Sequence, residues 1–367
     1  MRVQCNSAFI DGSLTNEVWF DIRDGIIAGI VSGLCAEPDI AIPGIVIPGF
    51  VDIHCHGGGG YYFSSESSEE IEKVIATHRS HGTTGVMASL VTEPLPVLKA
   101  QISRLVEFVS RDRILGIHLE GPYLAPSRAG AHDVSLLRKP LVSEFQELLA
   151  VGKGSIKMVT LAPEMEGAMA AIEYLVSQGV IVALGHTEAS SQIAIDALAA
   201  GASVITHFNN ATPKLEAGVD NLSSVVIADP HTFLELIMDG HHVSQPLMRQ
   251  VIESAPERLV LITDAMCAAG GVDGHYTIGE LPVTVTDGVA RLNSNHALAG
   301  STLTMDRAFL NFLDMGYALD AAIAATSFNA AQVLGDSGRG VIKVGARADL
   351  VCYEPGLGRV SMIAIDR

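Results

Sequence analysis

The feature that most constrains the fold is an alternation that begins near residue 46. Short apolar runs, rich in β-prone residues, are separated there by longer amphipathic stretches. Nearly continuous apolar runs are typical of parallel strands covered on both faces, and their alternation with helical stretches is typical of βαβ units. Eight such runs predict a (β/α)₈ barrel. The predicted strands are Gly49–His54, Thr84–Leu90, Ile114–Leu119, Ile156–Leu161, Val180–Leu184, Ser203–His207, Phe233–Met238 and Leu259–Thr263.

The segments between these runs favour helices. Helical periods extend over Glu69–Ser80, Leu95–Ser110, Gly167–Ser177 and Glu188–Ala200, and Gly201 then stands where a helix C-cap is expected. An open doubly wound sheet is the alternative. It is disfavoured because no Gly-x-Gly-x-x-Gly motif follows the first predicted strand. We therefore expect the α/β class with a TIM-like barrel.

Neither end of the chain shows this alternation of strand and helix patterns. Residues 1–47 contain short β-prone runs with a hairpin turn at Asp24-Gly25. After Asp264 the alternation stops, and the pattern predicts a hairpin, two helices and a return to strands, at Tyr276–Leu292, Thr302–Asp314, Ala318–Thr326 and Gly340–Val351. The simplest assembly is a small β-sandwich domain built from residues 1–47 and 336–367. The barrel, residues 48–335, is inserted between these two parts.

Composition excludes several classes of function. The formal net charge of −18 argues against a nucleic-acid partner, which requires a basic surface. No apolar run approaches the roughly 20 residues of a membrane span, and the N-terminus lacks the apolar region of a signal peptide. The five cysteines are odd in number and include no Cys-x-x-Cys pair, which argues against a disulfide framework or a structural zinc knuckle and fits a reducing compartment. We expect a cytoplasmic protein without a membrane anchor.

The first predicted strand ends in two histidines one residue apart, His54 and His56. Side chains alternate between the faces of a strand, so these two rings point the same way. Cys55 points to the other face and is interpreted as a core residue. Neutral imidazole is a common ligand of zinc and iron, so the pair indicates a metal site better than it indicates packing.

The ends of the other predicted strands carry further histidines and carboxylates, where barrel enzymes place their chemistry. Glu120, His186 and His207 can surround one divalent cation, Zn²⁺ or Fe²⁺. A second ion can be held by His54 and His56, with Glu120 as the bridge. Asp264, at the end of the last strand, is positioned to accept a proton from a metal-bound water. We interpret His118 as a buried structural histidine.

The motifs at these positions, together with several others, resemble the N-acetylglucosamine-6-phosphate deacetylase family of the amidohydrolase superfamily. The motifs that carry the resemblance are Pro48–Asp52, His118–Leu124, Gly130–His132, Leu184–Thr187, Thr206-His207, Asp239–His242, Leu261–Ala265, Leu298–Met305 and Gly345–Leu350. It implies metal-dependent hydrolysis of a linear N-acetyl amide, with Glu120, His186 and His207 as ligands and Asp264 as general base and acid. His132 matches a residue that polarises the acetamide carbonyl. Substrate contacts are implied for Asn210, Ala211, His242 and Leu298.

One departure from the family pattern bears on the substrate. Family members carry a phosphate-binding arginine about ten residues after the histidine that corresponds to His207. In this sequence no arginine occurs between Ala211 and Leu222, and Lys214 is the cation in this segment. N-acetylglucosamine-6-phosphate is the expected substrate. N-acetylgalactosamine-6-phosphate, an unphosphorylated N-acetyl amino sugar, another amidohydrolase reaction and a catalytically inactive sugar-binding protein are the alternatives. The resemblance also implies a homodimer.

Overall fold

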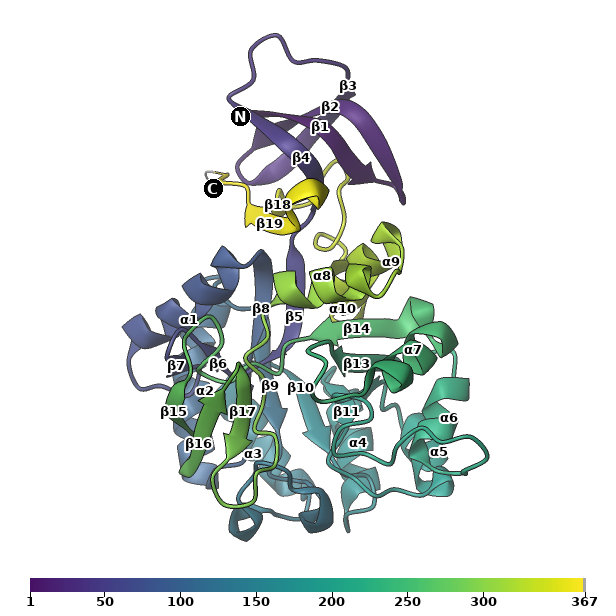
Figure 1. The fold of residues 1–367 in the computed structure, drawn as a ribbon. Coiled ribbons are helices and arrows are strands. Elements are labelled where there is room, and N and C mark those ends of the chain that lie inside the picture. Colours follow the sequence, from purple (N-terminus) through teal and green to yellow (C-terminus); the bar gives the residue numbers. More distant parts are fainter. Residues whose placement is uncertain (366–367) are drawn as a thin grey trace.

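The computed structural model describes residues 1–365 and divides the chain into an α/β barrel and a smaller β domain (Figure 1). Eight parallel strands form one sheet in the spatial order β14-β13-β12-β11-β10-β9-β8-β5, which confirms the predicted barrel. The strands are β5 (Phe50–Cys55), β8 (Thr83–Leu90), β9 (Gly116–Glu120), β10 (Ile156–Leu161), β11 (Ile181–Leu184), β12 (Val204–Ile205), β13 (Phe233–Ile237) and β14 (Leu259–Ile262).

The barrel closes where β5 meets the end of β14. The backbone N–H of Asp264 donates to the carbonyl of His54 at 2.9 Å, and that of His56 donates to Ala265 at 3.0 Å. Below them, the buried Asp52 carboxylate accepts the Thr263 hydroxyl at 2.6 Å. Burial raises the pKa of Asp52 to about 6, although the hydrogen bonds from Thr263 and His54 oppose this shift. Closure therefore fixes the first and last strand ends against each other.

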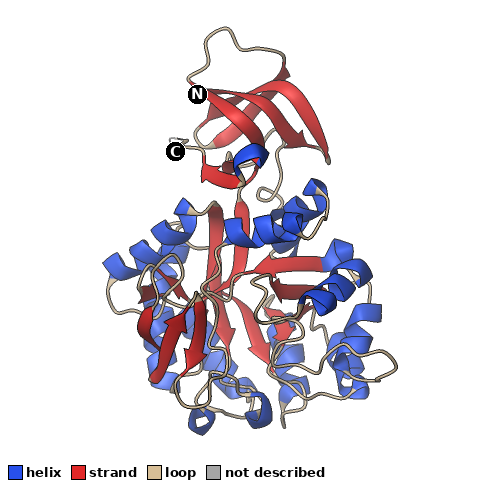
Figure 2. Ribbon diagram, viewed as in Figure 1, coloured by secondary structure: helices blue, strands red, loops and turns tan. Residues whose placement is uncertain are grey.

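Helices cover the outside of the barrel (Figure 2). Their sequences begin with good caps, since Ser67, Ser190 and Asn221 each accept a backbone N–H of the first turn. The predicted helical segments are confirmed to within a few residues. The helices are α1 (Ser68–Ser80), α2 (Leu95–Ser110), α3 (Val142–Gly152), α4 (Ala168–Ser177), α5 (Ser191–Ala199), α6 (Leu222–Ala228) and α7 (Gln245–Ser254).

The small domain is built from both ends of the chain, as predicted. Its six strands are hydrogen-bonded in the order β19-β18-β4-β1-β2-β3. The predicted hairpin at Asp24-Gly25 is present, and both residues have the positive φ that a tight two-residue turn requires, 49° and 71°. The strands are β1 (Arg2–Ile10), β2 (Ser13–Arg23), β3 (Ile26–Ser32), β4 (Ile40–Pro48), β18 (Leu350–Glu354) and β19 (Arg359–Met362). The domain limits given above stay a prediction.

The prediction of strand structure from Gly340 onward was wrong for most of that segment, because β18 begins only at Leu350. Gly340 and Gly345 adopt φ values of 68° and 86°, which break an extended chain. The buried Arg339 side chain fixes this tail, since its guanidinium reaches Asp349 at 2.7 Å and Asp112 at 2.8 Å. The segment is therefore an anchored loop between the barrel and the small sheet.

The chain after Asp264 forms a three-stranded sheet and then a bent helical run. The predicted hairpin is present as β15 (Gly274–Ile278), β16 (Leu281–Thr286) and β17 (Val289–Leu292). After α8 (Met305–Asp314), α9 (Leu319–Ile323) continues through a π-helical turn (Ala324–Phe328) into α10 (Asn329–Val333). The helix predicted over Ala318–Thr326 therefore does not end there. Among residues 1–365, none of the helices has the length and apolar character needed to cross a bilayer.

Candidate active site

The histidines and carboxylates predicted at the strand ends converge at one mouth of the barrel. Glu120 is the last residue of β9, and His186, His207 and Asp264 each follow their strand by two residues. All four are buried, with exposed fractions of 2–7%. The structure therefore brings together residues that are separated by up to 144 positions, from Glu120 to Asp264, in the sequence.

Three of these residues adopt left-handed backbone conformations that side chains other than glycine rarely take. The φ angles are 47° at His186, 31° at His207 and 47° at Asp264. Such conformations cost on the order of 1–3 kcal/mol each and persist where the surrounding structure imposes them. At each site the strand stops and the chain turns, which directs the side chain into the mouth rather than along the sheet.

Glu120, His186 and His207 place their donor atoms together. Glu120 Oε1 lies 3.1 Å from His186 Nε2 and 2.9 Å from His207 Nε2, and the two nitrogens are 3.0 Å apart. His186 Nδ1 donates to the carbonyl of Arg128 at 2.8 Å, and His207 Nδ1 donates to that of Asn210 at 3.0 Å. In the neutral rings the lone pairs are therefore on Nε2, and both face a carboxylate.

The second histidine pair lies beside this group. His54 Nε2 and His56 Nε2 are 3.1 Å apart, which agrees with the same-face prediction. Asp264 Oδ1 lies 3.3 Å from His56 Nε2 and 3.6 Å from His54 Nε2. Glu120 Oε2 lies 3.2 Å from His56 Nε2, so Glu120 contacts both histidine groups.

This donor set fits divalent cations. Lone pairs and carboxylate oxygens that face one another at about 3 Å repel unless a positive charge lies between them. His54, His56, Glu120 and Asp264 form one group whose ligand atoms all lie within 4.8 Å of one another. Imidazole nitrogen and carboxylate oxygen are the ligand types of catalytic zinc and of non-haem iron. The geometry is compatible with an ion at Glu120, His186 and His207, and the group of His54, His56, Glu120 and Asp264 could also hold one.

Electrostatics keep both carboxylates ionised. Burial opposes the charged form of Glu120, but His54 and hydrogen bonds from His132, His186 and His207 hold its pKa well below the usual range. The pKa of Asp264 is also lowered, because the charges and hydrogen bonds of His54 and His56 outweigh its burial. The lowered pKa favours the ionised form of Asp264, which can accept a proton.

His132 reaches the same mouth from the loop after β9. Its Nδ1 accepts the backbone N–H of Thr92 at 3.3 Å and contacts the Thr92 hydroxyl at 2.9 Å. This contact leaves the proton on Nε2, which lies 3.5 Å from Glu120 Oε2. Burial lowers the pKa of His132. The neutral form of the side chain is therefore favoured, with Nε2 facing Glu120.

These residues surround a cavity of about 310 Å³ at the barrel mouth. His242 lies in its wall, and its Nδ1 contacts Asp239 Oδ2 at 2.6 Å. Although burial disfavours the charged ring, Asp239 raises the pKa of His242. Leu298 is brought to the wall by its β-bridge with Arg291 of β17. Every predicted substrate contact lines the cavity, namely His132, Asn210, Ala211, His242 and Leu298.

Two residues near the site have partners that agree with a structural role. His118 contacts Ser89 Oγ at 2.9 Å and Thr160 Oγ1 at 2.8 Å, below the mouth. Cys55 Sγ lies 3.1 Å from His78 Nε2, on the opposite face of β5 from the histidine pair. These hydrogen bonds are consistent with the interpretation of His118 and Cys55 as interior residues.

Sequence reasoning missed Glu235. This fully buried carboxylate lies in the middle of β13, and its Oε2 is 3.0 Å from His54 Nδ1. The signal was present, since Glu235 is the one charged residue in the apolar run Phe233–Met238. A charge in a buried strand requires a partner, but the sequence does not show which one.

Comparisons with known proteins identify the family of the chain. Residues 45–362 match the family model described as the amidohydrolase family. The chain belongs to the amidohydrolase family. A relative of this amidohydrolase, N-acetylgalactosamine-6-phosphate deacetylase of Escherichia coli O157:H7, is 36% identical over 94% of each chain. N-acetylglucosamine-6-phosphate deacetylase of Vibrio furnissii is 33% identical over 83% of this chain and 78% of its own.

Solved structures extend the comparison. A mutant N-acetyl-D-glucosamine-6-phosphate deacetylase of Mycobacterium smegmatis, in complex with N-acetyl-D-glucosamine-6-phosphate, superposes on this amidohydrolase with a TM-score of 0.93. It is 38% identical, and the match covers 97% of this chain and 96% of that one. The N-acetylglucosamine-6-phosphate deacetylase of Thermotoga maritima gives a TM-score of 0.87 at 30% identity, over 98% and 96% of the two chains. The barrel and the small domain are thus shared with deacetylases.

Proposed function

We propose that this amidohydrolase removes the N-acetyl group of an N-acetyl amino sugar 6-phosphate, with N-acetylglucosamine-6-phosphate as the first candidate. The products are acetate and the free amino sugar phosphate. The observation that carries the proposal is the convergence of Glu120, His186 and His207 beside the ionised Asp264 carboxylate. The relatives and solved structures described above carry the names of amino sugar phosphate deacetylases, which supports the same substrate class.

A divalent cation, Zn²⁺ or Fe²⁺, held by Glu120, His186 and His207 would lower the pKa of a water molecule and polarise the acetamide carbonyl. Asp264 accepts the proton of the attacking water as its oxygen bonds to the carbonyl carbon. His132 donates a hydrogen bond from Nε2–H to the carbonyl oxygen, where negative charge develops. Asp264 then returns the proton to the amide nitrogen as the C–N bond breaks, and the amine leaves.

The cavity wall supplies the substrate contacts. His242, whose pKa is raised, can carry positive charge toward an anionic group on the sugar. Asn210 and Ala211 present amide groups, and Leu298 provides an apolar contact for the acetyl methyl group. Arg128 also lines the cavity, where its Nε lies 2.8 Å from Glu188 Oε1. We propose Arg128 as a cation that compensates for the arginine absent after Ala211.

N-acetylgalactosamine-6-phosphate is the second candidate, because a deacetylase for that sugar shares 36% identity with this chain. Acetate release should be measured from both sugar phosphates and from unphosphorylated N-acetylglucosamine, with metals determined on the same sample. Release from either phosphate, with much weaker release from the free sugar, supports the proposal. Equal rates with and without the phosphate would show that the enzyme does not require a phosphate on its substrate. No acetate release from any of the three sugars would indicate another amidohydrolase reaction or an inactive sugar-binding protein.

We also propose that the protein acts in the cytoplasm as a homodimer. The family resemblance supports the homodimer, and five cysteines without a Cys-x-x-Cys pair fit a reducing compartment. A second copy could contribute a cation to the part of the cavity that binds the phosphate, where this chain offers few cations. Light scattering tests the assembly, and a molar mass near 38.6 kDa would contradict it.

A further inference from the structure

Glu235 is a buried carboxylate beside the site to which the proposed reaction assigns no step. It lies in the middle of β13, between the apolar residues Leu234 and Leu236, and its exposed fraction is 0%. An ionised carboxylate in such a place is costly unless it is paired and hydrogen-bonded. Its contacts therefore indicate why the barrel interior contains it.

The contacts of Glu235 lead to both metal-binding groups. Its Oε2 accepts from His54 Nδ1 at 3.0 Å and from the backbone N–H of His207 at 3.2 Å. Its other oxygen, Oε1, is buried and accepts no hydrogen bond from the part of the chain that the structure describes. One carboxylate oxygen thus connects His54 of β5 with His207, which follows β12.

The hydrogen bond to His54 determines which ring nitrogen is free. Because Glu235 accepts from Nδ1–H, the lone pair of the neutral ring is on Nε2, 3.1 Å from His56 Nε2 and 3.6 Å from Asp264 Oδ1. The ring is also held from the side by His118, whose centroid lies 4.6 Å away in an edge-on arrangement. A carboxylate behind a ligand histidine fixes the tautomer and raises the basicity of the ligand nitrogen.

We propose that Glu235 is a positioning residue that allows this chain to bind a second divalent ion at His54 and His56. Glu235 holds the imidazole in the metal-binding tautomer and orientation without itself contacting the ion. This inference rests on the proposed function for the presence of the first ion at Glu120, His186 and His207. The occupancy of the second position is then set by a residue that lies outside both ligand groups.

Titration of the metal-free protein with Co²⁺ tests this, because metal stoichiometry is read without any substrate. The wild-type chain should bind two ions. Glu235→Leu removes both acceptor oxygens and should weaken the second ion about 10- to 100-fold, with the first retained. Glu235→Gln keeps one acceptor oxygen and should restore much of the second affinity. Co²⁺ absorption bands report the two sites separately, and acetate release is recorded independently.

The controls separate positioning from general structural support. Asp349→Asn changes a buried carboxylate outside both ligand groups, one that accepts from Arg339 and Arg347 just before β18, and should leave two ions bound. Replacing a buried charge with a well-packed apolar residue is often neutral for stability, so metal-free Glu235→Leu should unfold near the wild-type temperature. If it does not fold, Glu235→Gln alone decides, by a measurable loss of second-ion affinity.

Three results would overturn the proposal. They are a wild-type chain that binds one ion, a Glu235→Leu chain that binds two with unchanged affinity, and equal weakening by Asp349→Asn. Failure of the proposed function would appear differently, as two bound ions without acetate release from any of the sugars. In that case the positioning role of Glu235 stands while the substrate assignment falls.

Discussion

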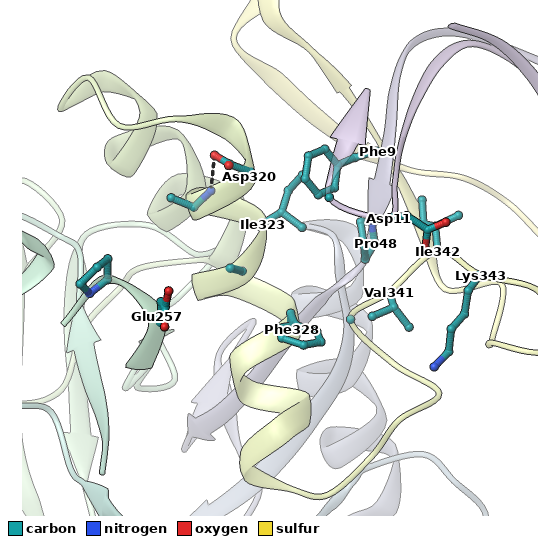
Figure 3. A pocket seen from close by; sticks show the side chains of 15 residues that line it. Phe9, Asp11, Pro48, Glu257, Asp320, Ile323, Phe328, Val341, Ile342 and Lys343 are labelled. Carbon is teal, nitrogen blue, oxygen red and sulfur yellow. Dashed lines mark hydrogen bonds between the residues drawn. The ribbon is translucent and has the colours of Figure 1, made fainter. Parts of the chain in front are cut away.

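Two cavities of the molecule differ in character. The cavity at the barrel mouth has a volume of about 310 Å³ and collects histidines and carboxylates whose donor atoms face one another. The other, of about 520 Å³, lies between the small domain and the helical run after α8, and apolar side chains such as Phe9, Ile323 and Phe328 line it (Figure 3). The charged groups around it, among them Glu257 and Lys343, lie apart from one another (Figure 3). Volume therefore does not locate the chemistry in this protein, whereas converging unpaired donor atoms do.

The two cavities also lie at opposite ends of the same strands. Pro48, just before β5, borders the larger cavity, and His56, just after β5, borders the smaller one. In α/β barrels the carboxyl ends of the strands carry catalysis and the amino ends contribute stability. The comparison thus predicts that changes at the mouth alter rate, and that changes at the other end alter stability.

The largest effect is expected from Asp264→Asn. The amide cannot accept the proton of the attacking water, so kcat should fall about 10³-fold or more. The ion at Glu120, His186 and His207 should remain, because Asp264 is not one of its three ligands. Steady-state acetate release and metal analysis on one preparation check both statements. Retained activity would remove Asp264 from its role as general base.

His132→Leu should have the next largest effect. The substitution removes the Nε2–H donor that faces the carbonyl position, and loss of one such donor costs about 10²- to 10³-fold in kcat. The expected signature is a fall in kcat with a smaller change in KM, at unchanged metal content. A defect confined to KM would instead show that His132 contributes to substrate binding in the ground state. It would weaken the expectation that changes at the mouth alter the rate.

The mouth was predictable from the sequence to a large extent. Apolar runs mark the strands, and the polar residue that ends each run marks the rim, so Glu120, His186, His207 and Asp264 were found without coordinates. The two-residue period of a strand put His54 and His56 on one face. Glu235 was not found, because its partner lies on a strand 181 residues away, and only closure of the barrel brings them together. The roles of all these residues remain proposals.

The opposite end was less predictable. The segment from Gly340 reads as β-prone, yet positive φ angles at Gly340 and Gly345 and the ion pairs of Arg339 make it a loop. Helical periodicity likewise could not show that Ala324–Phe328 forms a π-helical turn, because one widened turn changes the period for a few residues only. Structure at this end depends on contacts between the domains rather than on local pattern.

Ile323→Ala tests that end directly. Ile323 is 3% exposed, belongs to the barrel core and also lines the larger cavity. The truncation should lower the free energy of unfolding by about 2–4 kcal/mol, as for other large-to-small core changes. Denaturant unfolding measures the loss, and kcat/KM of the folded fraction should stay within about twofold. A large drop in kcat/KM at full folding would show that the two ends are coupled, and the contrast between the cavities would fail.

The smallest effect concerns pH and the ion pair that joins α1 to α8. His81 caps the C-terminus of α1, and its Nδ1 lies 3.0 Å from Asp306 Oδ2 in the first turn of α8. The hydrogen bond with Asp306 raises the pKa of His81. Burial favours the neutral form of Asp306, but the hydrogen bond with His81 outweighs it and lowers the pKa of Asp306. Each charge also lies at the helix end that favours it.

The sign of this pH dependence follows from the two shifts. The stability contributed by His81 is complete below its ordinary pKa of about 6.5 and is lost as pH rises through the higher folded value. That of Asp306 is present above its ordinary pKa of about 3.8 and is lost at lower pH. The difference in unfolding free energy between wild type and His81→Asn should therefore be greater at pH 5.5 than at pH 8.5, and should stay below about 1 kcal/mol because the pair is partly exposed. Equal differences in unfolding free energy at both pH values would show that His81 acts through packing alone. A change in kcat at saturating substrate would show that His81 is coupled to the residues at the barrel mouth.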